Sequence, residues 1–382
     1  MKIAIRTYAG LEEILQSEIE SITNKKTIIQ KRAVSLDGEM EDVYKINLWS
    51  RFAIDVLVQL HSFKASHENI LYKYAHQFEW EKYMTKNQSF SISSIVHSRF
   101  FKHSQYVALK VKDALVDRFR KIDGARPNVE RFKPDFNFVV RVSEDKVNIL
   151  WNTSGEPLFK RGYRKLTGEA PLNEILAASI IEFSGWKQEN PIIDPMCGSG
   201  TFVAEATMKA YNIAPGFYRE SFGFEKSNAH SHDQWMTILE KAKNSIKVNG
   251  TKIYGFDKSL AAVSMTKENI KLFHPSENII IEQSDYFNLN KPSEKGVLIM
   301  NPPYDQRLKN NAINELYSNI GTRLKHFWEN HDAWILSGNL QAIKHIGLKP
   351  KRKKVLFNGP LECKLINIPI YKGSLKRKKN IE

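Results

Sequence analysis

The sequence contains little cysteine and no long apolar run. Its two cysteines, Cys197 and Cys363, are far apart among 382 residues, and neither belongs to a Cys-x-x-Cys pair. This spacing argues against a disulfide framework and against a structural zinc site. No stretch approaches the roughly 18 apolar residues of a membrane-spanning helix, and residues 1–6 lack the apolar core of a signal peptide. We therefore expect a cytoplasmic protein that has neither a metal nor a membrane partner.

Acidic residues are scarce in two segments of the chain. Residues 99–133 carry 10 basic and 4 acidic side chains, and residues 301–382 carry 16 and 6, whereas the rest is nearly balanced. These two segments account for the formal net charge of +15. Clustered positive charge attracts polyanions, which predicts a nucleic acid partner. Two basic faces that merely keep the protein dissolved are the alternative.

The first part of the chain shows the pattern of two α+β domains. Apolar residues recur at helical or at alternating spacing between turn signals. The expected elements are strands at 2–6, 27–36, 53–63, 89–97, 136–142 and 146–152, and helices at 10–22, 43–50, 67–75 and 105–121. Their order predicts a ferredoxin-like domain over residues 1–64, followed by a second α+β domain over residues 65–155.

The second part of the chain alternates strands with helices. Gly155-Glu156-Pro157 interrupts the earlier pattern, and we expect a linker at 156–171 and an α/β domain at 172–382. The expected strands include 192–193, 252–256, 278–282, 297–300 and 333–336, with a helix at 200–211 and a closing antiparallel pair at 354–357 and 365–370. This order predicts a largely parallel sheet with helices on both faces.

A turn with two glycines connects the first of these strands to its helix. It reads Asp194-Pro195-Met196-Cys197-Gly198-Ser199-Gly200-Thr201. The glycines allow the backbone to approach a ligand, and the helix start offers free N–H groups. Val203 occupies the place of the third glycine of the nicotinamide-dinucleotide motif, and the phosphate-binding G-x-x-x-x-G-K-[ST] motif is absent. An acid before the glycines suits a ligand with an ammonium or sulfonium group, and S-adenosylmethionine has both.

We take this turn as the candidate cofactor site. Its candidate residues are Asp194, Pro195, Cys197, Gly198, Ser199, Gly200 and Thr201. A tight turn with a buried aspartate is the alternative. Cys197 is interpreted as a small loop residue and not as a nucleophile, because the sequence places no base beside it.

Two more acids follow strands of the predicted sheet. Asp257 follows the strand at 252–256, where an acid can accept hydrogen bonds from ribose hydroxyls, and Asp285 follows the next strand, where it can accept from an adenine amino group. Glu225, within the inserted segment 212–250, is a rival for the ribose but follows no strand. Taken singly, either aspartate is equally consistent with a turn or a helix cap, whereas their place in one sheet favours ligand binding.

The strand at 297–300 ends in Asn301-Pro302-Pro303-Tyr304. The two prolines prevent the strand from continuing and fix a rigid turn at the carboxyl edge of the sheet, where such folds bind ligands. The Asn301 oxygen and the Pro302 carbonyl suit the two protons of an exocyclic amine, and Tyr304 suits stacking on a flipped base. We therefore predict that these four residues position an amino group for methylation. A proline-rich surface turn is the alternative.

At these residues the sequence resembles S-adenosylmethionine-dependent class I methyltransferases that methylate amino groups. Three further stretches, GEPLFKRGYR at 155–164, APLNEILAA at 170–178 and NGPLEC at 358–363, narrow the resemblance to the THUMP-domain guanine-N2 methyltransferases of the RlmL type. The resemblance is specific from residue 155 onwards, and before that it rests on the order of elements. It implies a Rossmann-like class I methyltransferase sheet, preceded by a ferredoxin-like domain and a THUMP RNA-binding domain.

The resemblance also implies an activity. It implies S-adenosylmethionine on residues 194–201, with Asp257 at the ribose and Asp285 at the adenine, and a guanine amino group at residues 301–304. The implied reaction is N2 methylation of guanine in RNA, with 23S rRNA as the most favoured substrate. The domain that makes 7-methylguanosine in fused relatives is expected to be missing, because the sequence ends after one sheet.

Other functions stay open at this point. Asn-Pro-Pro-Tyr also occurs in DNA adenine-N6 methyltransferases, but the predicted basic helix at 105–121 precedes the catalytic domain, an order that favours RNA. A tRNA guanine-N2 methyltransferase has similar parts. A non-catalytic RNA-binding assembly factor would have no reason to keep the glycine turn, both acids and Asn301. His230 and His232 lie in a polar context that favours a loop over a metal site.

Overall fold

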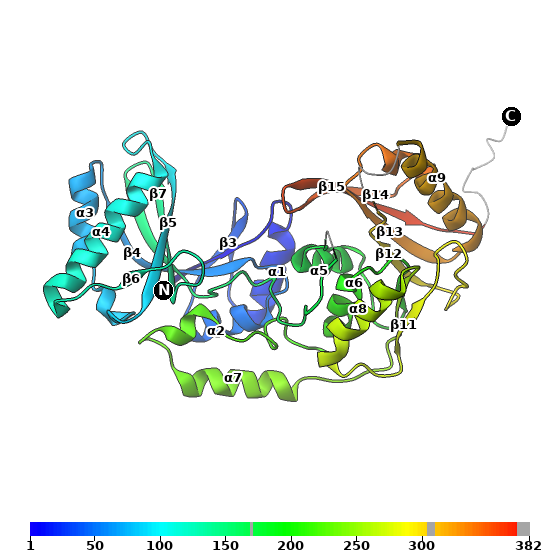
Figure 1. Cartoon of the computed structure of the whole chain (residues 1–382), viewed down its shortest axis with the longest axis horizontal. Helices are drawn as coiled ribbons and strands as arrows, with labels where there is room; N and C mark the ends of the chain where they lie inside the picture. Colours follow the sequence, from blue (N-terminus) through cyan, green and yellow to red (C-terminus); the bar gives the residue numbers. More distant parts are fainter. Residues whose placement is uncertain (169–170, 304–309, 373–382) are drawn as a thin grey trace. The chain divides into compact units, whose positions relative to one another are not determined.

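The computed structural model describes residues 1–168, 171–303 and 310–372, and the chain forms two compact units (Figure 1). The first unit comprises Met1–Gly162 and Ala214–Asn244, and the second comprises Tyr163–Ile213 and Ser245–Glu382. The sequence predicts one boundary within residues 156–171. The chain instead returns to the first unit for the segment Ala214–Asn244, so both units are built from two stretches of sequence.

One eight-stranded sheet runs through the first unit, in the order β2-β3-β1-β4-β8-β7-β5-β6. Its strands are β1 (Lys2–Arg6), β2 (Ile28–Gln30), β3 (Ala33–Asp37), β4 (Asp55–Lys64), β5 (Ser89–His97), β6 (Asn128–Val129), β7 (Phe136–Ser143) and β8 (Lys146–Asn152). β4 pairs antiparallel with β8, with a bulge between Gln59 and His61. The ferredoxin-like part and the second α+β part therefore share one continuous sheet.

The stretch predicted as one strand at residues 27–36 is a β-hairpin. β2 and β3 pair antiparallel, and Arg32 in the turn between them has a φ of 56°. Gln30 Nε2 donates to Ser35 Oγ across the hairpin at 2.9 Å. Side-chain alternation is the same in one long strand and in two short ones, so the pattern did not reveal the reversal.

Helices cover one face of this sheet. They are α1 (Glu12–Thr23), α2 (Met40–Trp49), α3 (Glu68–Gln77) and α4 (Ser104–Asp123), and α3 and α4 lie side by side (Figure 1). Ile3 and Ile5 of β1 are fully buried, whereas Lys2 is exposed. Trp80, in the short helix η1 (Trp80–Lys82), packs edge-on against Phe138 of β7 with ring centroids 5.0 Å apart. Because side chains alternate along a strand, Lys2 lies on the opposite face of β1 from Ile3 and Ile5.

Aromatic packing explains why Ala214–Asn244 belongs to the first unit. The segment contains the short helix η2 (Gly223–Lys226) and α7 (His232–Asn244). Tyr44 of α2 packs against Phe224 at 4.7 Å and against Trp235 at 5.8 Å between ring centroids. The Tyr44 hydroxyl lies 3.1 Å from His230 Nδ1. These contacts give the segment an apolar partner on α2.

The second unit contains a seven-stranded sheet in the order β11-β10-β9-β12-β13-β15-β14. Its strands are β9 (Ile192–Asp194), β10 (Ile253–Asp257), β11 (Ile279–Gln283), β12 (Gly296–Met300), β13 (His331–Ser337), β14 (Arg352–Asn358) and β15 (Leu361–Pro369). β9 to β13 run parallel, and β15 pairs antiparallel with both β13 and β14. The predicted α/β class and its closing antiparallel pair are confirmed.

The strand order explains where a ligand site forms. β9 lies between β10 and β12, so the chain order reverses at β9. Ligands of such sheets bind beyond the carboxyl ends of the strands at this reversal. The helices of the unit are α5 (Glu174–Phe183), α6 (Thr201–Ala210), α8 (Leu260–Ile270) and α9 (Asn310–Phe327), with short helices η3 (Lys271–Phe273) and η4 (Ala342–Ile346). Within the three described ranges, no helix has the length and apolar content to cross a membrane.

Candidate functional site

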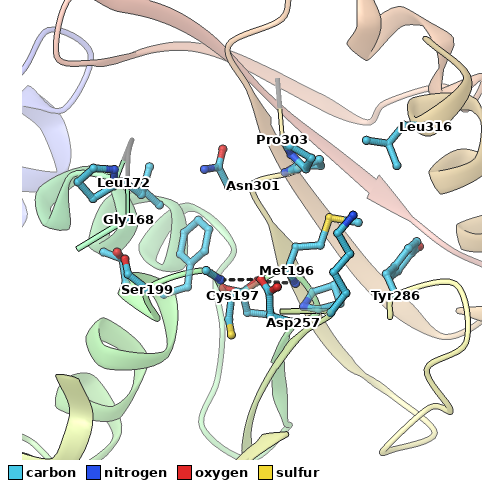
Figure 2. Close-up of a pocket in the computed structure, with 18 of the residues that line it drawn as sticks. Gly168, Leu172, Met196, Cys197, Ser199, Asp257, Tyr286, Asn301, Pro303 and Leu316 are labelled. Atoms are coloured by element: carbon cyan, nitrogen blue, oxygen red, sulfur yellow. Dashed lines mark hydrogen bonds between the residues drawn. The ribbon is translucent and has the colours of Figure 1, made fainter. Parts of the chain in front are cut away.

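A cavity of about 820 Å³ lies at the carboxyl ends of the parallel strands of the second unit's sheet (Figure 2). Its volume is typical of small-molecule sites, which measure about 300–1,000 Å³. Most of the predicted site residues line it: Asp194, Pro195, Cys197, Gly198, Ser199, Thr201, Asp257, Asp285, Asn301, Pro302 and Pro303. Gly200 is not part of the lining, and Tyr304 lies outside the described residues. The cavity therefore brings together residues from four strand ends.

The glycine turn adopts left-handed backbone at both glycines. Gly198 has a φ of 54° and Gly200 a φ of 81°, and Gly200 caps the N-terminus of α6. The Cys197 N–H donates to Phe256 O at 2.8 Å, which ties the turn to β10. This conformation requires glycine at both positions, because an L side chain is strained there.

Helix α8 clamps the turn from behind, a contact that the sequence did not reveal. Thr266 Oγ1 donates to Gly198 O at 2.9 Å, and Asn269 Nδ2 donates to Ser199 O at 3.0 Å. Thr266 and Asn269 are both fully buried. A Cβ on Gly200 would lie 2.5 Å from Thr266 Cγ2. Buried side-chain hydrogen bonds thus hold the turn in one conformation.

Arg164 supports the turn from its other side. Its Nη2 donates to Thr201 Oγ1 at 3.0 Å and its Nη1 to Ser199 Oγ at 3.3 Å. Its Nε pairs with Glu174 Oε1 of α5 at 2.8 Å, and both side chains are about nine-tenths buried. Arg164 belongs to the stretch at 155–164 that carried the resemblance. The sequence therefore singled out the stretch that contains Arg164, but it did not indicate that this arginine holds the glycine turn.

Asp194 and Asp257 form the acidic side of the cavity. Asp194 is buried and accepts one hydrogen bond, from Met196 N at 3.2 Å. Burial, together with the negative charge of Asp257, raises the pKa of Asp194 well above its usual value. The Asp257 oxygens accept from Gly198 N at 3.0 Å and Ser259 N at 2.9 Å. Each of these oxygens has a second lone pair, so Asp257 can also accept from ligand hydroxyls.

Asp285 lies beyond the end of β11, beside aromatic side chains. Its Oδ1 accepts from Phe287 N at 2.8 Å, which shapes the turn. Its Oδ2 has no hydrogen-bond partner among the described residues. Tyr286 and Phe287 also line the cavity, with ring centroids 5.2 Å apart. An open carboxylate oxygen beside apolar surface suits a flat ring that carries an amino group.

Asn301 lies across the cavity from the acids. Figure 2 shows Asn301 and Pro303 on one side, and Cys197, Met196 and Asp257 on the other. The Asn301 Oδ1 atom is buried and has no hydrogen-bond partner within the described ranges. A buried carbonyl oxygen without a partner costs free energy, about 1–3 kcal/mol. A donor on a ligand is the partner that this oxygen lacks.

Other residues that the sequence analysis considered stand apart from this chemistry. Cys197 is buried, and burial is the main cause that raises the pKa of its thiol, so a reactive thiolate is disfavoured. Glu225 belongs to the first unit and does not line the cavity. His230 contacts Tyr44 and Phe224, and its partner His232 is exposed. In the part of the chain that the structure describes, no cluster of His, Cys, Asp and Glu could hold a metal.

The hydrogen-bond acceptors of the cavity fit S-adenosylmethionine. Asp194 offers a carboxyl group to a cation, Asp257 offers free lone pairs to a ribose, and Asp285 offers an open oxygen to an adenine amino group. Left-handed glycine backbone leaves space above Gly198, since a Cβ there would meet nothing within 4 Å. The cationic part, the ribose and the adenine amino group of the molecule thus each have a complementary acceptor in the lining.

Three family models match consecutive parts of the chain. The family described as RMKL-like, methyltransferase domain, matches residues 161–367, the THUMP domain matches residues 65–151, and the RlmL ferredoxin-like domain matches residues 2–57. These matches confirm the resemblance and the fold class that the sequence predicts.

Relatives and solved structures match nearly the full chain. The ribosomal RNA large subunit methyltransferase K/L of Psychromonas ingrahamii is 37% identical over 380 residues, which are 98% of this chain and 50% of that protein. The crystal structure of SMU.472 complexed with SAH has a TM-score of 0.84 at 26% identity and covers 98% of this chain and 99% of its own. A predicted N6-adenine-specific DNA methylase from Listeria monocytogenes has a TM-score of 0.84 at 25% identity, with coverages of 98% and 96%. The chain spans about half the length of the curated relatives that it matches.

Proposed function

Because the chain belongs to the family of RMKL-like methyltransferases, we propose that it transfers a methyl group from S-adenosylmethionine to the exocyclic N2 of a guanine in 23S rRNA. The observation that carries this proposal is Asn301 Oδ1, a buried oxygen without a partner among the described residues, at the edge of a cavity whose far side is acidic. Ribosomal RNA as substrate also implies a cytoplasmic location.

The acidic side holds the methyl donor. Asp194 faces a cationic group, Asp257 accepts from the ribose hydroxyls, and Asp285 accepts from the adenine amino group. When bound, the donor supplies an electrophilic methyl group on a sulfonium. The turn at Gly198 and Gly200, held by Arg164 and Thr266, keeps backbone N–H groups at the ligand without rearrangement.

The Asn301 side holds the nucleophile. A guanine amine is a poor nucleophile because its lone pair is delocalised into the ring. Asn301 Oδ1 and the Pro302 carbonyl accept hydrogen bonds from its two N–H groups, which draws the nitrogen towards tetrahedral geometry. The nitrogen then forms the new N–C bond, the electron pair of the S–C bond returns to sulfur, and one amine proton leaves to water. Alignment of the two groups is the main contribution, since effective molarities reach about 10⁵ M or more.

Two observations favour RNA as the polymer. The THUMP match covers residues 65–151, and the K/L relatives are named ribosomal RNA large subunit methyltransferases. A guanine in tRNA is the closer rival, and a DNA adenine is the other, because the neighbour from Listeria monocytogenes carries that description. An adenine N6 amine would satisfy Asn301 equally well, so the choice between the polymers rests on the first unit.

The test is nucleoside mass spectrometry after methylation in vitro. The full chain is incubated with S-adenosylmethionine carrying a deuterated methyl group and, separately, with 23S rRNA, tRNA and DNA. We expect labelled N2-methylguanosine in 23S rRNA. Asn301→Ala should abolish the label, while calorimetry shows an unchanged affinity for SAH.

Asn288→Ala is the matched control, since Asn288 is exposed and does not line the cavity. It should methylate at the wild-type rate. Turnover retained by Asn301→Ala would contradict the assignment of the amide. Label in tRNA alone, or N6-methyladenine in DNA, would replace the proposed substrate by the corresponding rival.

A further inference from the structure

We propose that the helix-free face of the first unit's sheet binds a single-stranded stretch of the RNA substrate. The proposal rests on the proposed function only in taking RNA as the polymer. A second hollow, of about 550 Å³, lies on this face. Strand residues from β1, β3, β4, β7 and β8 line it, together with the segment between α1 and β3.

Unpaired cations surround this hollow. Lys2, Lys26, Arg141 and Lys146 line it, all four are exposed, and none forms an ion pair with a described residue. Lys25 also lines it but is bound to Asp42 at 2.6 Å. Asp37 is the acidic residue of the lining. The positive excess in so small an area matches the phosphate groups of a polyanion.

The floor of the hollow offers hydrogen bonds that phosphate binding does not need. Asn148 Oδ1 is buried and has no partner among the described residues, although a cross-strand neighbour, Arg141, lies opposite it. Gln59 of β4 lines the same floor and is half-buried. Amide groups of this kind recognise the edges of unpaired bases. A buried acceptor beside exposed cations therefore indicates a nucleotide ligand.

Apolar side chains complete the floor. Leu57, Val139 and Leu150 form a small buried cluster with Ala4 packed against it, and Ala4 and Leu150 line the hollow. Alternation of side chains places this cluster on the same face as Gln59, Asn148 and Arg141. The half-buried Ala4 and the edge of Leu150 give the floor an apolar part that the face of a base can contact. A duplex has its bases paired and stacked, so this floor favours a single strand.

The basic helix α4, on the covered face, is the competing surface, but its charges are largely paired within the protein. Arg118 pairs with Glu81, Arg120 pairs with Asp117 at 3.0 Å, and Lys112 pairs with Asp113 at 2.8 Å. Lys110 lies over the Tyr72 ring at 5.5 Å. The local charge excess that the sequence shows at residues 99–133 is therefore partly neutralised in the fold.

Fluorescence anisotropy of the full chain tests the site. The probe is a labelled single strand of RNA of about ten nucleotides, free or annealed to its complement. Arg141→Gln with Lys146→Gln should weaken single-strand binding at least tenfold. It should also lower the slope of log K against log salt by about 1.4, since each phosphate contact to a single strand contributes about 0.7. Lys110→Gln with Lys112→Gln removes the same charge from α4 and should change neither quantity.

Asn148→Ala separates base recognition from charge. It should weaken single-strand binding on the order of tenfold, the effect of one lost contact to a base, with an unchanged salt slope. Equal weakening by the two double variants, or equally tight binding of the duplex, would overturn the site while leaving RNA methylation intact. Failure of the wild-type chain to bind either RNA would overturn both the site and RNA as substrate. An unchanged far-UV circular dichroism spectrum and thermal transition of every variant shows that the first unit, which contains all these substitutions, is folded.

Discussion

Gly200→Ala tests whether α8 holds the glycine turn rigid. Gly200 has a φ of +81°, and an added Cβ would lie 2.5 Å from Thr266 Cγ2 and 2.9 Å from Thr266 Oγ1. Thr266 is fully buried, and its hydroxyl already donates to Gly198 O, so it cannot turn away without losing that bond. Left-handed backbone costs alanine about 1–2 kcal/mol, and overpacking a buried contact costs about 1–3 kcal/mol more.

Gly198→Ala is the matched control for this substitution. Gly198 also has left-handed backbone, with a φ of +54°, but a Cβ there would meet nothing within 4 Å. The two variants should therefore differ by the overpacking contribution alone. Since 1 kcal/mol shifts the Tm of a unit of this size by about 2–4 °C, Gly200→Ala should unfold about 2–12 °C below Gly198→Ala. Differential scanning calorimetry measures this on the transition that SAH shifts.

A second substitution identifies the clashing atom. Thr266→Ser removes Cγ2 and keeps the hydroxyl that donates to Gly198 O. In the Gly200→Ala background it should recover part of the lost Tm, whereas in the wild-type background it should lower the Tm slightly. Equal transitions for the two alanine variants, or no recovery by Thr266→Ser, would refute the clamp.

Two further predictions concern the acids. Asp257→Ala should weaken the affinity for S-adenosylmethionine about 10–100-fold in calorimetry, the effect of lost hydrogen bonds to a charged group, whereas Glu225→Ala should not change it. Asp194→Asn should raise the Tm of the ligand-free protein at pH 7. The pKa of Asp194 is raised in the folded state, so this carboxyl group lowers the stability of the fold once the pH exceeds its pKa in the unfolded chain. In the wild type, the affinity for the cationic donor should increase with pH through this raised pKa, and Asp194→Asn should remove that dependence; a pH-dependent affinity in the variant would contradict the pairing.

The strongest local signals in the sequence correctly predicted where the strands end, and the predicted residues line one cavity. The apolar run before Asn301 and the two prolines after it specify a buried strand that ends abruptly, and β12 ends at Met300. Asp194 and Asp257 follow strands of the same parallel sheet, so the topology alone brings them to one edge. These predictions depend on residues next to each other and on the order of the strands along the sequence, and both can be read from the sequence alone.

The contacts that hold the site depend on distant residues, and local patterns do not contain them. Thr266 and Asn269 are ordinary helix residues in the sequence, and only the packing of α8 behind the turn gives them partners. Ala214–Asn244 reads as an insertion between two strands of one domain. Its aromatic residues Phe224 and Trp235 pack against Tyr44, which lies more than 150 positions earlier. The spacing of apolar residues in the sequence cannot predict such a distant contact.

The distribution of charge in the cavity fits the amine target that we propose better than an ionised group. The carboxyl groups of Asp194, Asp257 and Asp285 line the cavity together with the neutral amide of Asn301, and Figure 2 shows Asn301 and Pro303 across from Asp257. A phosphate or another anion brought to Asn301 would find a neutral amide and two prolines, which carry no charge to attract it. A neutral amine needs only acceptors for its protons, which the amide and a backbone carbonyl provide. In the proposed reaction the attacking nitrogen loses its proton after it has gained positive charge, so this step requires no strong base beside Asn301.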